Sequence, residues 1–172
     1  MLYVGIDTGV QGAIAAYDPD LHDLVLLADM PVDVVEINGK DRNRISRVRM
    51  LEILRPLTGA HAAVEYPEAR PMKSVNKKDG TLTTRQPGAA GMLSFGMSYE
   101  AVAMGCVACG LILTEMRPRA WKREMNLGSS KDDSRRRAAN QFPNWASKFS
   151  RVKDDGRAEA ALMALWQAER RG

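Results

Sequence analysis

In the segment LYVGIDTGVQGAIAAYD, residues 2–18, two apolar runs flank one charged residue and a glycine-containing turn, which is the strongest indication of the fold class. Residues 2–7 and 12–17 are typical of short buried strands, and TGVQG between them is a turn signal. A third run, residues 24–29, follows the turn DPDLHD, so the pattern predicts an antiparallel meander. Asp7 closes the first strand, where a half-buried carboxylate needs something cationic to neutralise it.

The rest of the chain predicts helices and strands in alternation. Apolar residues recur at helical spacing in residues 42–57, and residues 62–65 form a further buried strand. Residues 67–91 are rich in Pro, Gly and Lys, which predicts one long loop. The remaining elements are a helix at 92–109, a fifth strand at 111–115 and helices around 119–125, 131–141 and 157–169. We therefore expect one domain, residues 1–172, of the α/β class with a mixed five-stranded sheet flanked by helices.

Composition indicates a soluble globular protein, with 45% hydrophobic and 27% charged residues among 172. No apolar stretch is long enough to span a membrane, and the first residues do not resemble a signal peptide, so we expect a cytoplasmic location. Cys106 and Cys109 form a lone C-x-x-C in an apolar run. We expect them to be reduced thiols packed on a helix rather than a zinc or redox site.

Positive charge is concentrated in residues 117–153, which hold eleven Lys or Arg against three acidic residues, whereas the net charge of the chain is +4. Such a segment favours a polyanionic partner, with a solvated helix surface as the alternative.

Four acidic residues from three predicted elements form a candidate metal site. Glu65 closes its strand as Asp7 closes the first, and Asp155 and Glu159 are four residues apart on one helix face. Each acid alone also has a structural explanation, as a turn former, a strand end, a helix cap or an intrahelical partner. Together they form the all-oxygen ligand set that Mg²⁺ prefers.

The motifs GIDTGVQGAIA, AAVEYP, RPRAWK, SSKDDSRRRAANQFP and DDGRAEAALMALW occur in this order. As a set they make the sequence similar to the RuvC-type Holliday junction resolvases, and specifically to the shorter branch found in phages. The resemblance extends to about residue 168 but lacks a counterpart for residues 31–43 and 67–91. It implies a ribonuclease-H-like fold and a homodimer that resolves four-way and related branched DNA by paired nicks. The products would carry 5′-phosphate and 3′-hydroxyl ends, and a phage enzyme would act in the cytoplasm of its bacterial host.

The resemblance also implies which residues act. Asp7, Glu65, Asp155 and Glu159 would be the catalytic carboxylates and the ligands of two Mg²⁺ ions per active site, with Mn²⁺ as a substitute. Asp154 stays an alternative to Asp155, because many relatives space the final pair by three and this chain does not. Lys122 and Lys131 would lie beside the scissile phosphate, and Lys122 would be a catalytic residue. The other DNA-binding residues of the basic segment would be Arg119, Arg135, Arg136 and Arg137.

The roles of two further segments, residues 67–91 and 92–109, each have more than one interpretation. Lys73, Lys77, Lys78 and Arg85 give the loop 67–91 a basic character that suits a segment ordering on DNA, but an unconstrained insertion fits equally well. The helix at 92–109 has more apolar surface than one core contact needs, and we expect the excess to form a dimer interface. We expect Trp121 to anchor its helix in the core rather than to stack on a base.

Three other classes of protein share parts of this pattern. An actin-like ATPase or sugar kinase opens with a similar strand and turn, but it needs a second copy of the fold, for which 172 residues leave no room. An RNA:DNA hybrid nuclease of the same fold stays open, as does a non-catalytic junction-binding protein, although the latter would not need all four acids.

Overall fold

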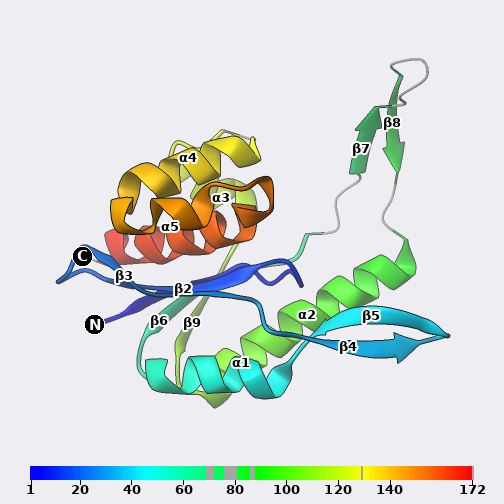
Figure 1. The fold of residues 1–172 in the computed structure, drawn as a ribbon, viewed down its shortest axis with the longest axis horizontal. Coiled ribbons are helices and arrows are strands. Elements are labelled where there is room, and N and C mark those ends of the chain that lie inside the picture. The colour runs from blue at the N-terminus through cyan, green and yellow to red at the C-terminus, as the bar shows by residue number, and fades with distance from the viewer. Residues whose placement is uncertain (69–71, 76–80, 86–87, 129, 172) are drawn as a thin grey trace.

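The computed structural model describes residues 1–68, 72–75, 81–85, 88–128 and 130–171. Its centre is a five-stranded sheet in the order β3-β2-β1-β6-β9 (Figure 1). The first three strands form the expected antiparallel meander, and β1, β6 and β9 run parallel to one another. The strands are β1 (Tyr3–Ile6), β2 (Ala13–Asp18), β3 (Asp23–Asp29), β6 (His61–Glu65) and β9 (Ile112–Met116). The expected mixed sheet flanked by helices is confirmed.

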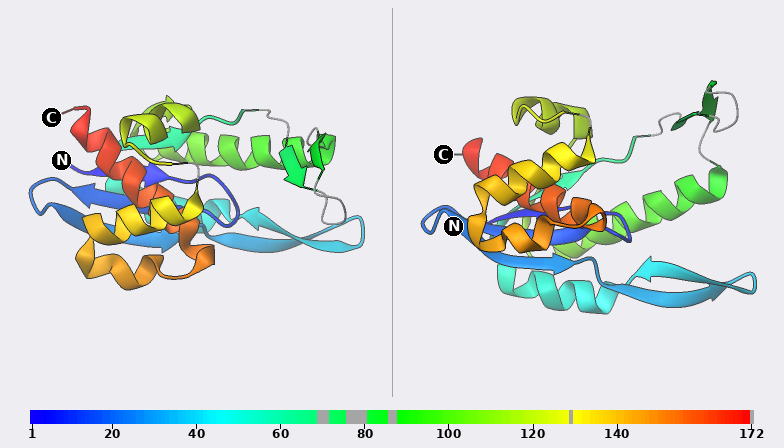
Figure 2. Two further views of the ribbon diagram at one scale, coloured as in Figure 1. Left: turned by 90° about the horizontal axis from the view of Figure 1, so that it is seen from above. Right: turned by 45° about the horizontal axis from the view of Figure 1, so that its top comes forward.

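Helices cover both faces of the sheet, as Figures 1 and 2 show. Ala13 and Ala15 of β2 face a core cluster with Trp121 and Leu162, whereas Ile14 faces the opposite cluster, because successive strand residues point to opposite faces. On the first face lie α3 (Pro118–Glu124), α4 (Lys131–Gln141) and α5 (Asp155–Glu169), and on the second lie α1 (Arg47–Leu54) and α2 (Ala89–Ala108). Short 3₁₀ turns are η1 (Arg55–Leu57), η2 (Pro143–Phe149) and η3 (Val152–Asp154).

The backbone of α5 packs directly against the backbone of β1 at Gly5. A Cβ atom added to Gly5 would lie 2.0 Å from the carbonyl oxygen of Ala160 and 2.5 Å from the nitrogen of Ala164. Only glycine permits this approach, because any side chain would overlap the helix backbone. The strand that leads to Asp7 therefore lies directly under the helix that begins with Asp155.

The helix predicted for residues 42–57 begins too early. Residues 42–45 belong to a strand, β5 (Lys40–Ile45), which pairs antiparallel with β4 (Val32–Ile37) over six residue pairs. Asn38 and Gly39 join them with φ of 52° and 69°, as the favoured two-residue hairpin turn requires. The Asn-Gly pair was the sequence signal for this hairpin, and it outweighs the helical spacing of the apolar residues that follow. The two strands form a ribbon that projects beyond the sheet (Figure 1).

The predicted long loop at residues 67–91 also contains strands. β7 (Met72–Val75) and β8 (Leu82–Arg85) pair antiparallel, so the expectation of a loop without regular structure is wrong at these positions. Thr83, Thr84 and Val75 are β-branched, which favours extended backbone even in a polar segment. Lys77 and Lys78 lie outside the described residues.

Both cysteines pack in the cluster beneath α2, as expected. Cys106 and Cys109 are buried free thiols, and burial raises the pKa of the Cys106 thiol to about 12. Such a thiol stays protonated and unreactive at neutral pH. Within the described part of the chain, no helix is both long enough and apolar enough to cross a membrane.

A candidate acidic site at one edge of the sheet

The topology brings Asp7 and Glu65 to one edge of the sheet. Strands β1 and β6 are parallel neighbours with Ile6 opposite Val64, so the residue after each strand pair lies at the same carboxyl edge. The first turn of α5 meets this edge. A Cβ atom on Gly156 would lie 2.6 Å from the carbonyl oxygen of Gln11 and 3.0 Å from Oδ2 of Asp7. Asp7 therefore faces the helix turn that follows Asp155.

The surroundings of Asp7 disfavour the ionised form of its carboxyl group. Its pKa is raised to about 6, chiefly by burial and in smaller part by the neighbouring charges of Glu159 and Asp155. The backbone N–H of Gly9, which donates to Oδ1 at 3.1 Å, and the charge of Lys122 act in the opposite direction. The shift shows that three of the four predicted acids are close enough to influence one another.

Helix α3 supplies hydrogen-bond donors to Glu65 and Glu159. The indole Nε1 of Trp121 donates to Glu65 Oε1 at 2.6 Å, and Lys122 Nζ forms an ion pair with Glu159 Oε1 at 2.6 Å. Burial raises the pKa of Glu65 to about 7 despite the Trp121 hydrogen bond. Two consecutive side chains of one short helix thus hold carboxylates from β6 and α5.

Trp121 is fully buried, which confirms its expected role as a core anchor. Its hydrogen bond to Glu65 was not foreseen, and no local pattern signals it because 56 residues separate the partners.

The carboxylate of Asp154 is held by two arginines. Asp154 is 2% exposed and accepts hydrogen bonds from the Arg151 guanidinium at 2.8–3.2 Å, which hold its pKa below the ordinary value. Arg157 approaches the same carboxylate at 3.6 Å. The Asp154 carboxylate is thus committed to two guanidinium groups and to the η3 turn, where it also accepts from the Arg151 backbone N–H at 2.9 Å. Asp155 is instead one of the acids whose charge acts on Asp7.

The donor chemistry fits a hard divalent cation, although the side chains are not gathered for one. Within the described residues, no three His, Cys, Asp or Glu side chains are close enough together to hold a metal ion as they stand. The four acids nevertheless offer only oxygen donors, which Mg²⁺ and Mn²⁺ prefer. Burial is the main cause of the raised pKa of Asp7 and Glu65, and a bound cation would favour the charged form of both carboxyls. Asp7, Glu65, Asp155 and Glu159 are the residues that would hold such ions.

The predicted DNA-binding residues occupy different surroundings. Arg119 is exposed on α3, whereas Arg135 pairs with Asp132 and donates to the carbonyl oxygen of Ser150, and Arg136 pairs with Asp133 at 2.6 Å. The acids of α4 thus neutralise part of the local positive charge. Of the remaining predicted DNA-binding residues that the structure describes, Lys73 belongs to β7, Arg85 to β8 and Lys131 to α4.

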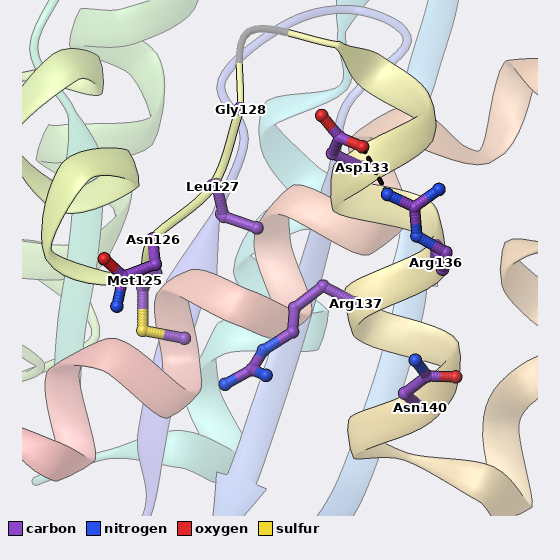
Figure 3. Close-up of a pocket in the computed structure, with 8 residues that line it drawn as sticks. All are labelled: Met125, Asn126, Leu127, Gly128, Asp133, Arg136, Arg137 and Asn140. Atoms are coloured by element: carbon purple, nitrogen blue, oxygen red, sulfur yellow. Dashed lines mark hydrogen bonds and ion pairs between the residues drawn. The ribbon is translucent and has the colours of Figure 1, made fainter.

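A pocket of about 400 Å³ lies between α4 and the segment that follows α3 (Figure 3). Its lining includes Arg136, Arg137 and Asn140 from α4 and contains none of the four candidate carboxylates. Figure 3 shows the Arg136 guanidinium turned to Asp133 and the Arg137 side chain pointing away from that pair, toward Met125. The pocket therefore presents one guanidinium that is not held by Asp133.

The fold is ribonuclease-H-like and of the RuvC type. It is defined by the sheet order, by two parallel strands that end in carboxylates and by the C-terminal helix that crosses them. No protein-family model matches the sequence, and no curated protein matches it. Among solved structures, the chain is similar to "T. thermophilus RuvC in complex with Holliday junction substrate", with a TM-score of 0.62 and 13% identity. It is also similar to "Thermus thermophilus RuvC structure", with a TM-score of 0.55 and 15% identity. Each match covers 99% of this chain and 96% of the other.

Proposed function

We propose that this protein is a metal-dependent endonuclease that resolves four-way and related branched DNA junctions by paired nicks, leaving 5′-phosphate and 3′-hydroxyl ends. One observation carries the proposal: Asp7 and Glu65 end adjacent parallel strands beneath the α5 turn with Asp155, in a fold similar to a RuvC bound to a Holliday junction. The phage branch of that family and a bacterial cytoplasm are the setting that the sequence motifs suggest.

The four carboxylates would hold two Mg²⁺ ions, or Mn²⁺ in their place. Bound there, such ions would supply activation of a water and stabilisation of the leaving oxygen of the cleaved phosphodiester. Lys122 brings an ammonium to the same group of acids and would contact the scissile phosphate. Trp121 would position Glu65, because its indole fixes one carboxylate oxygen and leaves the second oxygen for a ligand.

Paired nicks require two active sites, and α2 supports a homodimer. Leu93, Met104 and Val107 recur at helical spacing on one side of α2 and are 55–67% exposed. An exposed apolar stripe on a long helix suits contact with a second copy of the chain. A two-fold dimer would match the approximate two-fold symmetry of a four-way junction.

DNA contacts outside the acidic site would be mainly electrostatic. Arg119 and Arg137 are exposed and, within the described residues, neither takes part in an ion pair. Lys73, Lys77, Lys78 and Arg85 would add positive charge from the β7–β8 segment, and Lys131, Arg135 and Arg136 from α4. Phosphate contacts of this kind orient the substrate without reading its sequence.

The test is incubation with end-labelled four-way, three-way and linear DNA, and with a linear RNA:DNA hybrid. We expect symmetric nicks in the four-way junction with Mg²⁺ and no cleavage with EDTA. Cleavage of the linear hybrid faster than the junction would replace the proposal by a hybrid nuclease. Tight junction binding without cleavage under any divalent metal would identify a non-catalytic binder.

A matched pair of variants tests the site assignment. Asp155→Asn should lose cleavage and keep junction binding, whereas Asp154→Asn should keep metal-dependent cleavage but lose stability, because it breaks the Arg151 interaction. The reverse pattern would assign the metal-binding role to Asp154.

A further inference from the structure

The β4–β5 ribbon begins at the sheet edge that carries the acidic site. Strand β3 ends at Asp29, opposite Ala13 of β2, and the Asp7 N–H donates to the Ala13 carbonyl oxygen at 3.0 Å. The chain then enters β4 through Met30, whose N–H donates to Gly12. Asp29 also forms a bidentate pair with Arg157 of α5 at 2.5 and 2.6 Å. The root of the ribbon thus binds residues 12–13, whose backbone also holds the Asp7 N–H, and it binds the first turns of α5 through Arg157.

The base of the ribbon is held in place. The Ser46 N–H donates to the Pro31 carbonyl oxygen at 2.8 Å, closing the two strands at their root. Arg49 of α1 donates to the Val32 carbonyl oxygen and pairs with Asp33 at 2.7 Å. Beyond this base, both views of Figure 2 show the ribbon extending away from the sheet. The distal part is therefore an exposed arm on a fixed root.

The two faces of the arm differ in charge. In the β4–β5 register, Lys40, Arg42 and Arg44 are two residues apart and share one face with Ile37, Val35 and Asp33. The Asp33 carboxylate, opposite Arg44, pairs with Arg49 of α1 at the base of the ribbon. All three cations are exposed, and none takes part in an ion pair within the described residues. The opposite face carries the acids Glu36 and Asp41, which stand directly opposite each other.

The dimensions and chemistry of the basic face fit duplex DNA. Same-face side chains on a strand are about 7 Å apart, and a six-residue strand is about 20 Å long. A two-stranded ribbon of this kind is narrow enough for the major groove of B-DNA. Three unpaired cations in a row suit successive phosphates, whereas an exposed face this strongly charged does not suit an apolar protein contact.

We propose that the β4–β5 ribbon is a second DNA-binding arm, which holds a duplex arm of the substrate through Lys40, Arg42 and Arg44 next to the cleavage site. The inference rests on the proposed function, since it assumes a DNA substrate. It assigns a role to a segment for which the sequence motifs of the resolvases offer no counterpart.

The test compares two double variants that each remove two positive charges. Arg42→Gln with Arg44→Gln changes the ribbon, and Arg55→Gln with Arg171→Gln is the control at the opposite edge, where Arg55 precedes β6 and Arg171 lies near its first residue, His61. Binding of a four-way junction is measured in EDTA over a series of salt concentrations. We expect the slope of log affinity against log salt to fall by about 1.8 for the ribbon variant. The control slope should equal that of the wild type.

The outcomes separate the two proposals. If the wild type cleaves the junction but the ribbon variant has the wild-type salt slope, the ribbon proposal fails and the nuclease proposal stands. If the wild type neither binds nor cleaves branched DNA, both fail. Lys40→Glu at the exposed end of the ribbon is a second test of the ribbon proposal, because it reverses a charge beside the turn. It should weaken junction binding while leaving the thermal unfolding midpoint unchanged.

Discussion

The carboxyl of Asp7 offers the sharpest test of the acidic site, because its replacement should stabilise the metal-free protein. The residue is ionised above a pKa of about 6 in the folded chain, compared with an ordinary value of 3.8. The folded state therefore holds this proton more tightly than the unfolded state. Between pH 3.8 and about 6, stability is lost progressively as the pH rises, and the full loss is present above pH 7.

The magnitude follows from the difference between the two pKa values, which corresponds to at most about 3 kcal/mol at 1.36 kcal/mol per pKa unit. Asp7→Asn removes the charge and keeps an oxygen that can accept from the Gly9 N–H. The variant should thus be up to about 3 kcal/mol more stable than the wild type at pH 8 in EDTA. For a chain of this size, that corresponds to a rise of roughly 6–12 °C in the unfolding midpoint.

The assay is urea unfolding of both proteins at pH 5 and pH 8, with EDTA and with Mg²⁺. We expect the advantage of the variant to be large at pH 8, to shrink at pH 5, and to be offset when Mg²⁺ stabilises the wild type alone. The variant should still bind a four-way junction and should not cleave it. A variant that is less stable than the wild type at both pH values would refute the reasoning, since Asp7 would then be a stabilising group.

Three further variants test the surroundings of the acids. Lys122→Met should destabilise the metal-free protein by about 1–3 kcal/mol in urea unfolding, because Glu159 loses its ammonium partner, whereas Arg123→Met on the same helix should have little effect. Gly156→Ala should cost about 1–3 kcal/mol and slow cleavage, because the methyl group would meet Gln11 and Asp7, while Gly96→Ala in open space should be neutral or stabilising; equal effects would contradict the packing argument. Trp121→Phe should raise the pKa of Glu65 above about 7 and move the pH–rate profile of cleavage to higher pH, and an unchanged profile would show that the indole does not control Glu65.

The sheet and most helices were predictable because their signals are local. Alternating or continuous apolar runs marked β1, β2, β3 and β6, and α4 and α5 matched their predicted ranges to within two residues. The error at residues 42–45 arose because the helical spacing of apolar residues begins only at Ile45, and the three polar residues before it carry no apolar pattern that would separate a strand from a helix. Asn38-Gly39 resolves that ambiguity, because both residues adopt positive φ.

The site was predictable only as a list of acids. Strand ends and an i, i+4 pair indicated which carboxylates could meet, and the parallel register of β1 and β6 bears out the common edge. The partners were not predictable, because Trp121 and Lys122 reach Glu65 and Glu159 across 56 and 37 residues of sequence. The preference for Asp155 over Asp154 came from spacing, because four residues keep Asp155 and Glu159 on one helix face and five do not. The ion pairs of Asp154 with Arg151 and Arg157 were not predicted.

The contact between Gly5 and α5 has a consequence for how this chain can vary. Backbone touches backbone there, so the separation of β1 and α5 is fixed by atoms that every residue possesses. No side chain stands between them whose change of rotamer could adjust the distance. A larger residue at this single point would lift the helix together with Asp155 and Glu159, so one missing methyl group governs how these two carboxylates align with Asp7 and Glu65.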